Sequence, residues 1–363
     1  MKILIVTHYF HPHIGGIEIV AYNQAKELVK SGHKVTIITS KLKADNEYIL
    51  TDKIRIIRIN ALNPFEKRYH VPYPLFSPKL ASVLTKEIQN SDLVVLHGAL
   101  YMGSVFGVVI SKFLNKKVIT IEHVGFVPYN NLILNTIQRI VFLMFGKIVL
   151  NLSNKVLVLN PTVKKYVSGL TNTPIDISSN GVDTKLFHPV SIAAKIKLRK
   201  KYNLPLKKKI VLFVGRFVQK KGLDLVLRAK KSNFDLILVG SGVIDLPITD
   251  TGIHIFKNLP QTKIAEIYQI SDLYILPSRS EGFPLSILEA MASGLPVITT
   301  GKIYLGSINN KLIKLIKPEV CEIKNAIKEV LNDIILARKM SAYSRNMAIS
   351  KFTWKKSVSS LQI

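Results

Sequence analysis

The chain has one cysteine, few acidic residues and no long uninterrupted apolar run, and each shortage excludes a class of protein. Its single cysteine, Cys321, cannot form a disulfide within the chain and suits a reducing compartment. No run of about eighteen consecutive apolar residues occurs, so no membrane-spanning helix is predicted. The opening residues, MKILIVTHYF, contain an apolar run too short for a signal peptide and are typical of a first strand. A cytoplasmic protein is therefore expected.

The shortage of acidic residues gives the chain a large positive charge. It has 51 Lys and Arg against 23 Asp and Glu, a net charge of +28. Such a charge favours anionic partners, namely nucleotide phosphates, anionic lipid head groups or nucleic acid. Because no interleaving of aromatic and basic residues, no zinc-ligand spacing and no recognition helix is present, a nucleic-acid-binding protein is only a remote alternative.

The length of 363 residues and the 48% apolar content predict two packed domains. Strand-like runs separated by helical stretches indicate an α/β protein with parallel sheets. In the first half they are residues 2–7, 34–39, 54–59, 93–97, 117–122 and 156–159; in the second, 209–214, 236–239, 253–256, 273–276 and 297–299. Two Rossmann-like domains are expected, over 1–189 and 190–345, with a final segment 346–363.

Residues 278–300, SRSEGFPLSILEAMASGLPVITT, predict a sharp turn between a buried strand and a helix. Pro284 fits the first helical turn, whose free amides form a site for an anion such as a phosphate. Glu281 and Glu289 lie at both sides of that turn, where they can accept hydrogen bonds from hydroxyls. A ligand with phosphates between two hydroxyl-rich rings, a nucleotide sugar, meets both demands. Two solvated surface glutamates are the alternative interpretation.

A basic loop, VGRFVQKKG, follows the first strand of the second half. Arg216 and Lys221 at that strand's carboxyl end could neutralise a diphosphate leaving group. Gly240, in a glycine turn after the next strand, lies at the same predicted edge. Three loops are therefore expected to converge on one edge of the sheet, which we call the rim. The alternative interpretation of the Arg216–Lys221 stretch is an ordinary basic surface loop.

The first half offers weaker signals. Gly15 and Gly16 would let the backbone approach a phosphate, but from these residues alone an ordinary turn is favoured. His123 follows a strand at the sheet's carboxyl edge, where such folds bind ligands. No metal site is predicted for the histidines after the first strand, because they have no carboxylate or cysteine partner at a recognisable spacing: His8, His11 and His13.

Residues 132–150, LILNTIQRIVFLMFGKIVL, form a nearly continuous apolar stretch. A core helix is the favoured interpretation for most of it. An interfacial helix is the alternative, since Lys112, Lys116 and Lys117 nearby suit an anionic membrane surface. Peripheral attachment to the cytoplasmic face of a membrane is a further expectation.

Several motifs in order resemble a known family. They are GG (15–16), NGVD…F.P (180–189), GR….KG (215–222), VGSG (239–242) and PS…EGFP…LEAMA.G.PV (277–297). Together they cover nearly the whole chain and are similar to the family 4 retaining glycosyltransferases of the GT-B fold. The resemblance implies two Rossmann-like domains facing each other across a cleft, with a last helix, near FTW (352–354), crossing back to the first domain.

The resemblance also implies roles at matching positions. Arg216 and Lys221 would bind the diphosphate, and Glu289 would bind the ribose hydroxyls. Glu281 would act as a catalytic residue near the transferred sugar. His123 would lie near that sugar as an active-site residue. The backbone around the donor would come from the glycine loops and the helix start: Gly15, Gly16, Gly240, Gly282, Phe283, Pro284 and Leu285. The implied reaction is metal-independent hexosyl transfer with retention from a nucleotide sugar, without another cofactor, to a lipid-linked or surface-glycan acceptor.

The chain departs from the family pattern in two places. After PVITT it has GKIYLGSINNK where the family usually has a Gly-Gly turn and a Glu, and Lys257 stands where a glycine is common. The first departure affects the expected shape of the base or sugar end of the pocket. The remaining alternatives are a nucleotide-sugar epimerase or a phosphorylase on the same fold, and a catalytically inactive scaffold.

Overall fold

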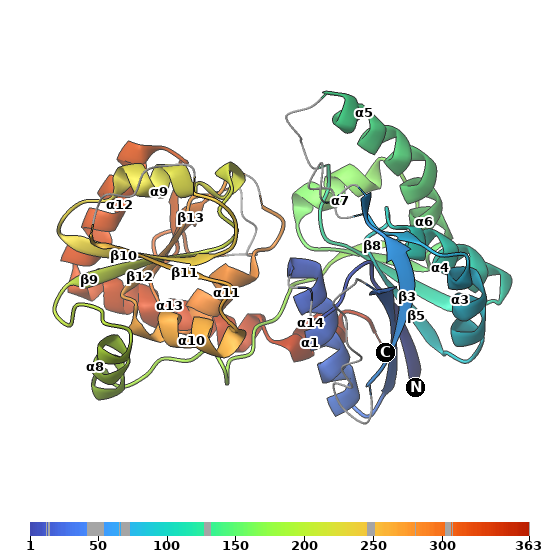
Figure 1. Ribbon diagram of the computed structural model, residues 1–363, viewed down its shortest axis with the longest axis horizontal. Helices are drawn as coiled ribbons and strands as arrows, with labels where there is room; N and C mark the ends of the chain where they lie inside the picture. Colours follow the sequence, from blue (N-terminus) through green and yellow to red (C-terminus); the bar gives the residue numbers. More distant parts are fainter. Residues whose placement is uncertain are drawn as a thin grey trace. The chain divides into compact units, whose positions relative to one another are not determined.

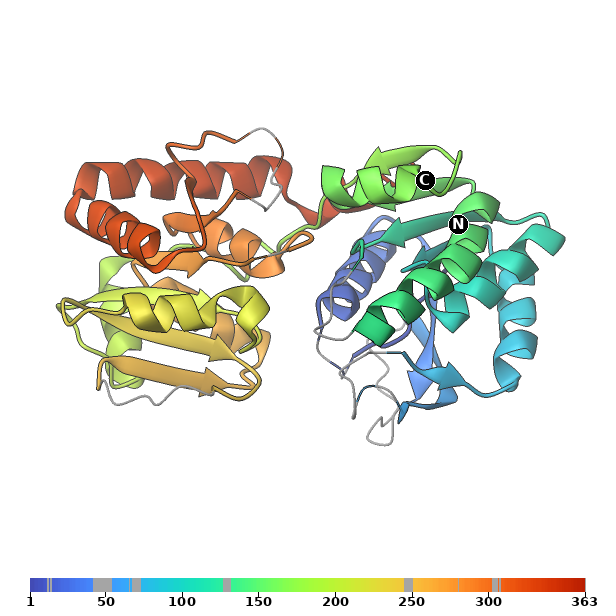
Figure 2. The ribbon, with the colours of Figure 1, turned by 90° about the horizontal axis from the view of Figure 1, so that it is seen from above.

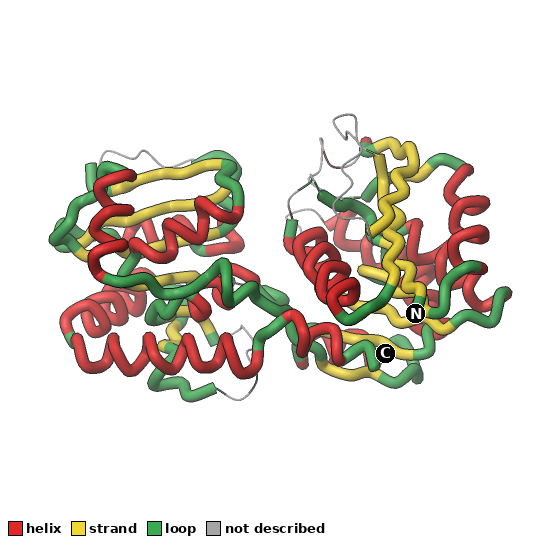
Figure 3. The backbone as a smooth tube through the Cα atoms, turned by 90° about the horizontal axis from the view of Figure 1, so that it is seen from below, coloured by secondary structure: helices red, strands yellow, loops and turns green. Residues whose placement is uncertain are grey.

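The computed structural model describes residues 1–11, 13, 15–41, 54–64, 66, 73–126, 132–244, 251–279, 281–301, 306 and 308–362. The chain forms two compact units, one of Met1–Asn180 with Trp354–Ile363 and one of Gly181–Thr353. Each unit contains its own sheet with helices on both faces, as the tube in Figure 3 shows. The predicted α/β class with two Rossmann-like domains is confirmed.

Unit 1 is built on a sheet with the order β4-β3-β2-β1-β5-β6-β7-β8, parallel except for the β3–β4 pair. Short helices and turns connect the strands in the doubly wound manner. The strands are β1 (Lys2–Val6), β2 (Lys34–Lys41), β3 (Ile54–Leu62), β4 (Leu75–Phe76), β5 (Leu93–His97), β6 (Lys117–Glu122), β7 (Lys155–Val158) and β8 (Ile175–Ile177). The helical segments are α1 (Gly16–Lys30), α3 (Lys79–Gln89), α4 (Met102–Phe113), α5 (Leu132–Val141), η1 (Phe142–Gly146), α6 (Lys147–Leu152), α7 (Pro161–Ser168) and α14 (Trp354–Ser359).

The unit 1 strands are continuous apolar runs because both faces of the sheet are covered. On β1, Leu4 and Val6 enter one core cluster, which α3, α4 and α6 complete. Ile3 and Ile5 point to the other face, into a cluster completed by α1 and by Leu361 of the chain's end. In Figure 1, α14 lies beside α1.

The division of the chain differs from the predicted boundaries at 189 and 345. Unit 1 ends at Asn180 and resumes at Trp354. The resumption is later than predicted because α13 (Ile334–Lys351) is one uninterrupted helix that packs on α11 (Leu285–Ala292) of unit 2. The residues that follow α13 pack on the face of unit 1 that carries α1.

Unit 2 has a wholly parallel sheet with the order β11-β10-β9-β12-β13-β14. Figure 1 and Figure 2 show α9 and α12 over one face of this sheet, while α10 and α11 cover the other. The strands are β9 (Lys209–Val214), β10 (Phe234–Gly240), β11 (Ile253–Lys257), β12 (Leu273–Leu276), β13 (Val297–Thr300) and β14 (Lys314–Ile316). The remaining helices are α8 (Ile192–Lys201), η2 (Gln219–Lys221), α9 (Leu223–Ala229), α10 (Gln261–Ile270) and α12 (Val320–Asn332).

Every predicted strand is present, with ends that shift by a few residues. Strands β4, β8 and β14 were not predicted, because they span two or three residues each and are too short to give a periodic pattern. Pro284 was predicted to lie inside the helix. The structure makes Pro284 the N-cap, with extended backbone, and α11 begins at Leu285.

The prediction that residues 132–150 form a core helix is wrong for most of the segment. The continuous helical segment Leu132–Leu152 is long and apolar enough to cross a membrane, and only 17% of its most apolar window is buried. The search for uninterrupted apolar residues missed it because Asn135, Gln138, Arg139 and Lys147 interrupt the run.

Candidate functional site

The candidate site of unit 2 lies where the strand order of its sheet reverses. Strands β9 and β12 are neighbours, although β10 and β11 come between them in the chain. The connections leaving β9 and β12 therefore run to opposite sides of the sheet. Open α/β sheets bind ligands at such a point, beside the carboxyl ends of the strands. Both charged stretches singled out in the sequence follow these two strands: residues 215–222 and 277–284.

The loops at this edge are bonded directly to one another. The Phe217 amide donates to the Ser241 carbonyl at 2.7 Å, and the Arg279 amide donates to the Lys220 carbonyl at 2.9 Å. A Cβ at Gly240 would lie 1.9 Å from a backbone oxygen, that of Gly215, so only glycine fits there. The loops after β9, β10 and β12 thus converge on one rim, as the sequence predicted.

An ion pair occupies the centre of this rim. Lys221 Nζ lies 2.6 Å from Glu281 Oε1, and the two side chains are 17% and 9% exposed. The Ser278 hydroxyl donates to the same carboxylate oxygen at 2.9 Å. Glu281 is therefore fixed in position by a cation and a hydroxyl that contact the same carboxylate oxygen.

Cations outnumber acids beside this pair. Lys220 is a neighbour whose pKa is lowered, chiefly by burial and further by Lys221 and Arg216, against the opposing effect of Glu281. Arg216 is exposed, and its side chain makes no hydrogen bond or ion pair with the described part of the chain. Two cations beyond the Lys221–Glu281 pair are thus available, as binding of a doubly charged anion requires.

A further cation of the rim, Arg279, is not available for a ligand. Its guanidinium donates to both carboxylate oxygens of Asp224, at 2.9 and 2.8 Å. This bidentate pair ties the loop after β12 to the first turn of α9, and it raises the pKa of Arg279. Lys257, the departure noted in the sequence, ends β11 beside Gly240 and is exposed at the same edge.

Glu289 lies about one turn inside α11, and no side chain caps the start of that helix. The Tyr268 hydroxyl donates to Glu289 Oε2 at 3.0 Å. Burial raises the pKa of Glu289 to about 7, because the surrounding protein penalises the charged form, and the hydrogen bond from Tyr268 offsets only part of this effect. A ligand that donates hydroxyl hydrogen bonds to Glu289 would stabilise its ionised form.

Unit 1 has its own reversal of strand order, between β1 and β5. At that edge His97 Nδ1 lies 2.9 Å from His123 Nε2. Both rings are buried, which lowers the pKa of His123 to about 3 and that of His97 well below its usual value, so both are neutral. His97 Nε2 is buried and has no hydrogen-bond partner among the residues that the structure describes.

This arrangement selects one tautomer for each ring. A buried N–H without an acceptor is rarer in proteins than an unused acceptor, so His97 carries its proton on Nδ1 and donates to His123. His123 then carries its own proton on Nδ1, a nitrogen with no hydrogen bond among the described residues. His123 is thus a neutral donor at the carboxyl edge of the sheet.

Glu122, given no role in the sequence analysis, supports the same edge. Its carboxylate accepts hydrogen bonds from the amides of Ala99 at 2.7 Å and Val124 at 3.4 Å. It therefore joins the loop after β5 to the loop after β6. Burial raises the pKa of Glu122 to about 7, and these backbone hydrogen bonds oppose that shift.

The two glycines after β1, which were expected to let the backbone approach a phosphate, have different surroundings. A Cβ at Gly15 would lie 2.3 Å from a carboxylate oxygen of Glu18, whereas nothing lies within 4 Å of the corresponding position at Gly16. Glu18 is buried and pairs with His13 at 3.0 Å. The chain's own carboxylate thus lies beside Gly15, and Gly16 alone is open to a ligand. Among the described residues, no three His, Cys, Asp or Glu side chains are grouped to hold a metal ion.

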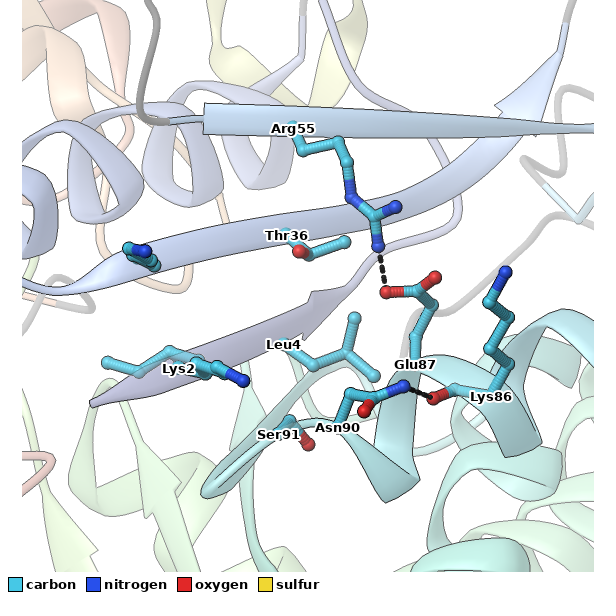
Figure 4. Close-up of a pocket in the computed structure, with 10 residues that line it drawn as sticks. Lys2, Leu4, Thr36, Arg55, Lys86, Glu87, Asn90 and Ser91 are labelled. Carbon is cyan, nitrogen blue, oxygen red and sulfur yellow. Dashed lines mark hydrogen bonds and ion pairs between the residues drawn. The ribbon is translucent and has the colours of Figure 1, made fainter.

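A separate hollow of about 280 Å³ opens at the opposite, amino-end edge of the unit 1 sheet (Figure 4). Lys2 and Lys34, which begin β1 and β2, line it together with the paired side chains of Arg55 and Glu87. Because doubly wound sheets bind ligands at the carboxyl ends of their strands, this hollow is not the candidate site.

Sequence reasoning missed three residues of the two rims: Lys220, His97 and Tyr268. Lys220 adjoins a predicted residue, and His97 ends a predicted strand, so both carried a signal. Tyr268 lies on α10, far from Glu289 in the chain, and had none. Part of the shortened GKIYLGSINNK stretch, residues 302–305 and 307, lies outside the described residues.

Comparisons with known proteins agree with this geometry. Residues 194–347 match the family Glycosyl transferases group 1, and residues 14–186 match Glycosyltransferase Family 4. An uncharacterized glycosyltransferase of Haemophilus influenzae is 29% identical over 300 residues, 78% of this chain and 76% of that protein. N-acetyl-alpha-D-glucosaminyl L-malate synthase of Bacillus anthracis is 25% identical over 383 residues, covering 96% and 93%. Anabaena Alr3699/HepE, solved in complex with UDP-glucose, has the same fold, with a TM-score of 0.77 at 16% identity, covering 100% of this chain and 98% of that one.

Proposed function

Because the chain belongs to the family 4, group 1 glycosyltransferases and has their GT-B fold, we propose that it transfers a hexose from a nucleotide-diphosphate sugar, with retention and without a metal ion, to a lipid-linked or surface-glycan acceptor. The Lys221–Glu281 pair, with two further cations on the same rim, is the observation that carries this proposal. It combines a binding place for a diphosphate with an acceptor for a sugar hydroxyl.

The diphosphate is proposed to bind among Arg216, Lys220, Lys221 and the open start of α11. These cations and helix amides supply positive charge where negative charge develops on the leaving phosphate. That charge is what a metal ion supplies in other transferases, so the residues suit a metal-independent reaction. The UDP-glucose in the HepE complex supports a donor of this class.

The two glutamates are proposed to hold the rings at the ends of the donor. Glu289 would accept hydrogen bonds from the ribose hydroxyls, and Glu281 from the transferred sugar. Gly282, Phe283, Pro284 and Leu285 connect them and would pass close to the diphosphate and the sugar. No Cβ fits at Gly240, which keeps the neighbouring loop close to the phosphate-binding rim.

The environment of Glu281 bears on the stereochemistry. Lys221 and the Ser278 hydroxyl both contact Oε1 of Glu281. Neutralisation of the carboxylate by a cation lowers its nucleophilicity, which opposes attack of Glu281 on the anomeric carbon. We therefore assign Glu281 a binding role. Retention would then follow from attack on the face that the leaving group departs from, with the departing phosphate accepting the proton of the acceptor hydroxyl.

Unit 1 is proposed to serve the same reaction through His123, which would donate its Nδ1 proton to a hydroxyl of the transferred sugar, and through the Gly15–Gly16 loop near the donor phosphates. The acceptor proposal is supported by the basic surface and by the exposed apolar helix of this unit. A single cysteine supports a reaction in the cytoplasm.

The test begins with a screen of UDP-, GDP- and ADP-linked sugars for protection against thermal unfolding, followed by assay of nucleoside diphosphate release. Arg216→Ala and Glu281→Ala should each reduce transfer by about a hundredfold or more, since each removes charge stabilisation at the diphosphate or sugar. Arg338→Ala is the matched control, because Arg338 is another exposed arginine of unit 2. Full turnover by both site variants would refute the proposal.

Product analysis separates the alternatives. A transferase needs a second substrate and releases a nucleoside diphosphate together with a new glycoside. An epimerase would convert the nucleotide sugar without an acceptor, and a phosphorylase would require inorganic phosphate and release a sugar phosphate. Either pattern would replace the transferase assignment.

A further inference from the structure

A row of apolar side chains on the segment α5–η1–α6 faces water. They recur every three or four residues, so they form one line along the helix. This apolar ridge consists of Ile133, Ile137, Ile140, Met144 and Ile148, which are 70, 49, 49, 57 and 41% exposed. Amphipathic helices normally bury such a line in the core, and here it is uncovered.

The opposite side of the same segment fixes it to unit 1. Phe142, Val149 and Leu150 are buried in the core cluster that includes α3 and α4. The neighbouring helix α4 adds Phe106 and Phe113, which are 39 and 83% exposed. The outer surface of this part of unit 1 therefore offers apolar area from more than one helix.

The same region has an unusual charge. Residues 99–175 contain seven lysines, one arginine and a single acidic residue, Glu122, which is buried. Arg139 and Lys147 are exposed on the ridge-bearing segment itself. Every exposed charged side chain described between Ala99 and Ile175 is therefore basic.

We propose that the apolar ridge binds the surface of a bilayer that contains anionic lipids, with the segment lying in the plane of the head groups. Exposed apolar side chains enter the boundary between head groups and acyl chains, and the flanking cations meet the lipid phosphates. A second copy of the chain is a poor occupant, because it would bring an equally basic surface into contact.

A transmembrane arrangement is disfavoured by the packing of the segment. A spanning helix would have to leave unit 1 over about twenty residues, exposing Phe142, Val149 and Leu150 and emptying part of its core. Lying on the surface preserves this core. The proposal goes beyond the donor reaction and needs no turnover for its test.

The experiment is sedimentation of the full chain with vesicles of phosphatidylcholine alone and of phosphatidylcholine with about 30% phosphatidylglycerol. Ile137→Glu/Ile140→Glu replaces two exposed ridge residues. The matched control is Ile334→Glu/Ile335→Glu, which makes the same change at exposed isoleucines of α13, 60 and 63% exposed. Because the control carries the same added charge, it separates ridge insertion from general attraction of a basic protein to anionic lipid.

We expect the ridge variant to lose about tenfold or more in affinity for the anionic vesicles, with the control close to the parent protein and with unchanged circular dichroism for all three. Equal binding of the two variants, or no binding of the parent protein at low salt, would overturn the proposal. Resistance of bound protein to alkaline carbonate extraction would indicate a spanning helix instead. A dimer abolished by the ridge variant, with no vesicle binding, would assign the ridge to a second copy.

Discussion

Donor binding should become tighter as the pH rises through neutrality, because of Glu289. Its pKa is about 7 in the ligand-free protein, above its ordinary value of 4.5. The ribose hydroxyls are proposed to donate to the ionised carboxylate, so a bound donor lowers this pKa again. The free protein must then release the Glu289 proton on binding wherever that proton is present.

The magnitude follows from the titration. At about pH 6 about nine in ten Glu289 side chains are protonated, and at about pH 8 about one in ten. Binding should thus release about 0.9 proton at the lower pH and about 0.1 at the higher, and affinity should rise about tenfold between them. The donor diphosphate is esterified at both ends, so neither of its phosphates titrates in this range.

Isothermal calorimetry in buffers of different ionisation enthalpy measures the proton count directly, using the nucleotide sugar that protects best in the melting screen. Glu289→Gln should remove both the proton release and the pH dependence. Glu122→Gln is the matched control, since that carboxyl in unit 1 also has a pKa of about 7. If Glu289→Gln retains the full pH dependence, Glu289 does not bind the ribose.

The same shift affects stability in the absence of donor. A carboxyl whose pKa is raised on folding gives stability that is fully present below its unfolded pKa of about 4.5 and is lost as the pH rises through about 7. Thermal unfolding of the parent protein should therefore occur at lower temperature at about pH 8 than at about pH 6, and Glu289→Gln should reduce the difference.

Three further variants test other parts of the site. Gly240→Ala should destabilise the protein by about 1–3 kcal/mol, because the added Cβ would overlap a backbone oxygen. Gly301→Ala should not destabilise it, because nothing lies within 4 Å of the Cβ position there. Thermal unfolding of the two variants tests this difference. Lys221→Met leaves the carboxylate of Glu281 buried without its cation and should lower the free energy of unfolding by about 2 kcal/mol or more. Adding Glu281→Gln to this variant should restore stability but not transfer activity. Equal stability of the single and double variants would contradict the ion pair. His97→Phe removes the hydrogen bond that fixes the tautomer of His123, so kcat should fall about tenfold or more while stability stays unchanged. Unchanged kinetics would show that His97 does not orient His123 for the reaction.

The sequence by itself determined the fold class and pointed to three charged residues of the unit 2 rim. Parallel sheets buried on both faces require continuous apolar strands, and those runs are readable one by one. Arg216, Lys221 and Glu281 were found because each follows such a strand, and the carboxyl ends of neighbouring parallel strands meet at one edge. The strands and these three residues could therefore be predicted from the local sequence pattern alone.

The tertiary structure alone decided which groups touch across the chain. Tyr268 reaches Glu289 from another helix, and His97 orders the ring of His123 from another strand, so no local pattern records either pair. The exposure of residues 132–152 was also a tertiary outcome. Periodicity shows that a helix has apolar side chains but not which side the rest of the protein covers, since burial depends on neighbours contributed by distant segments.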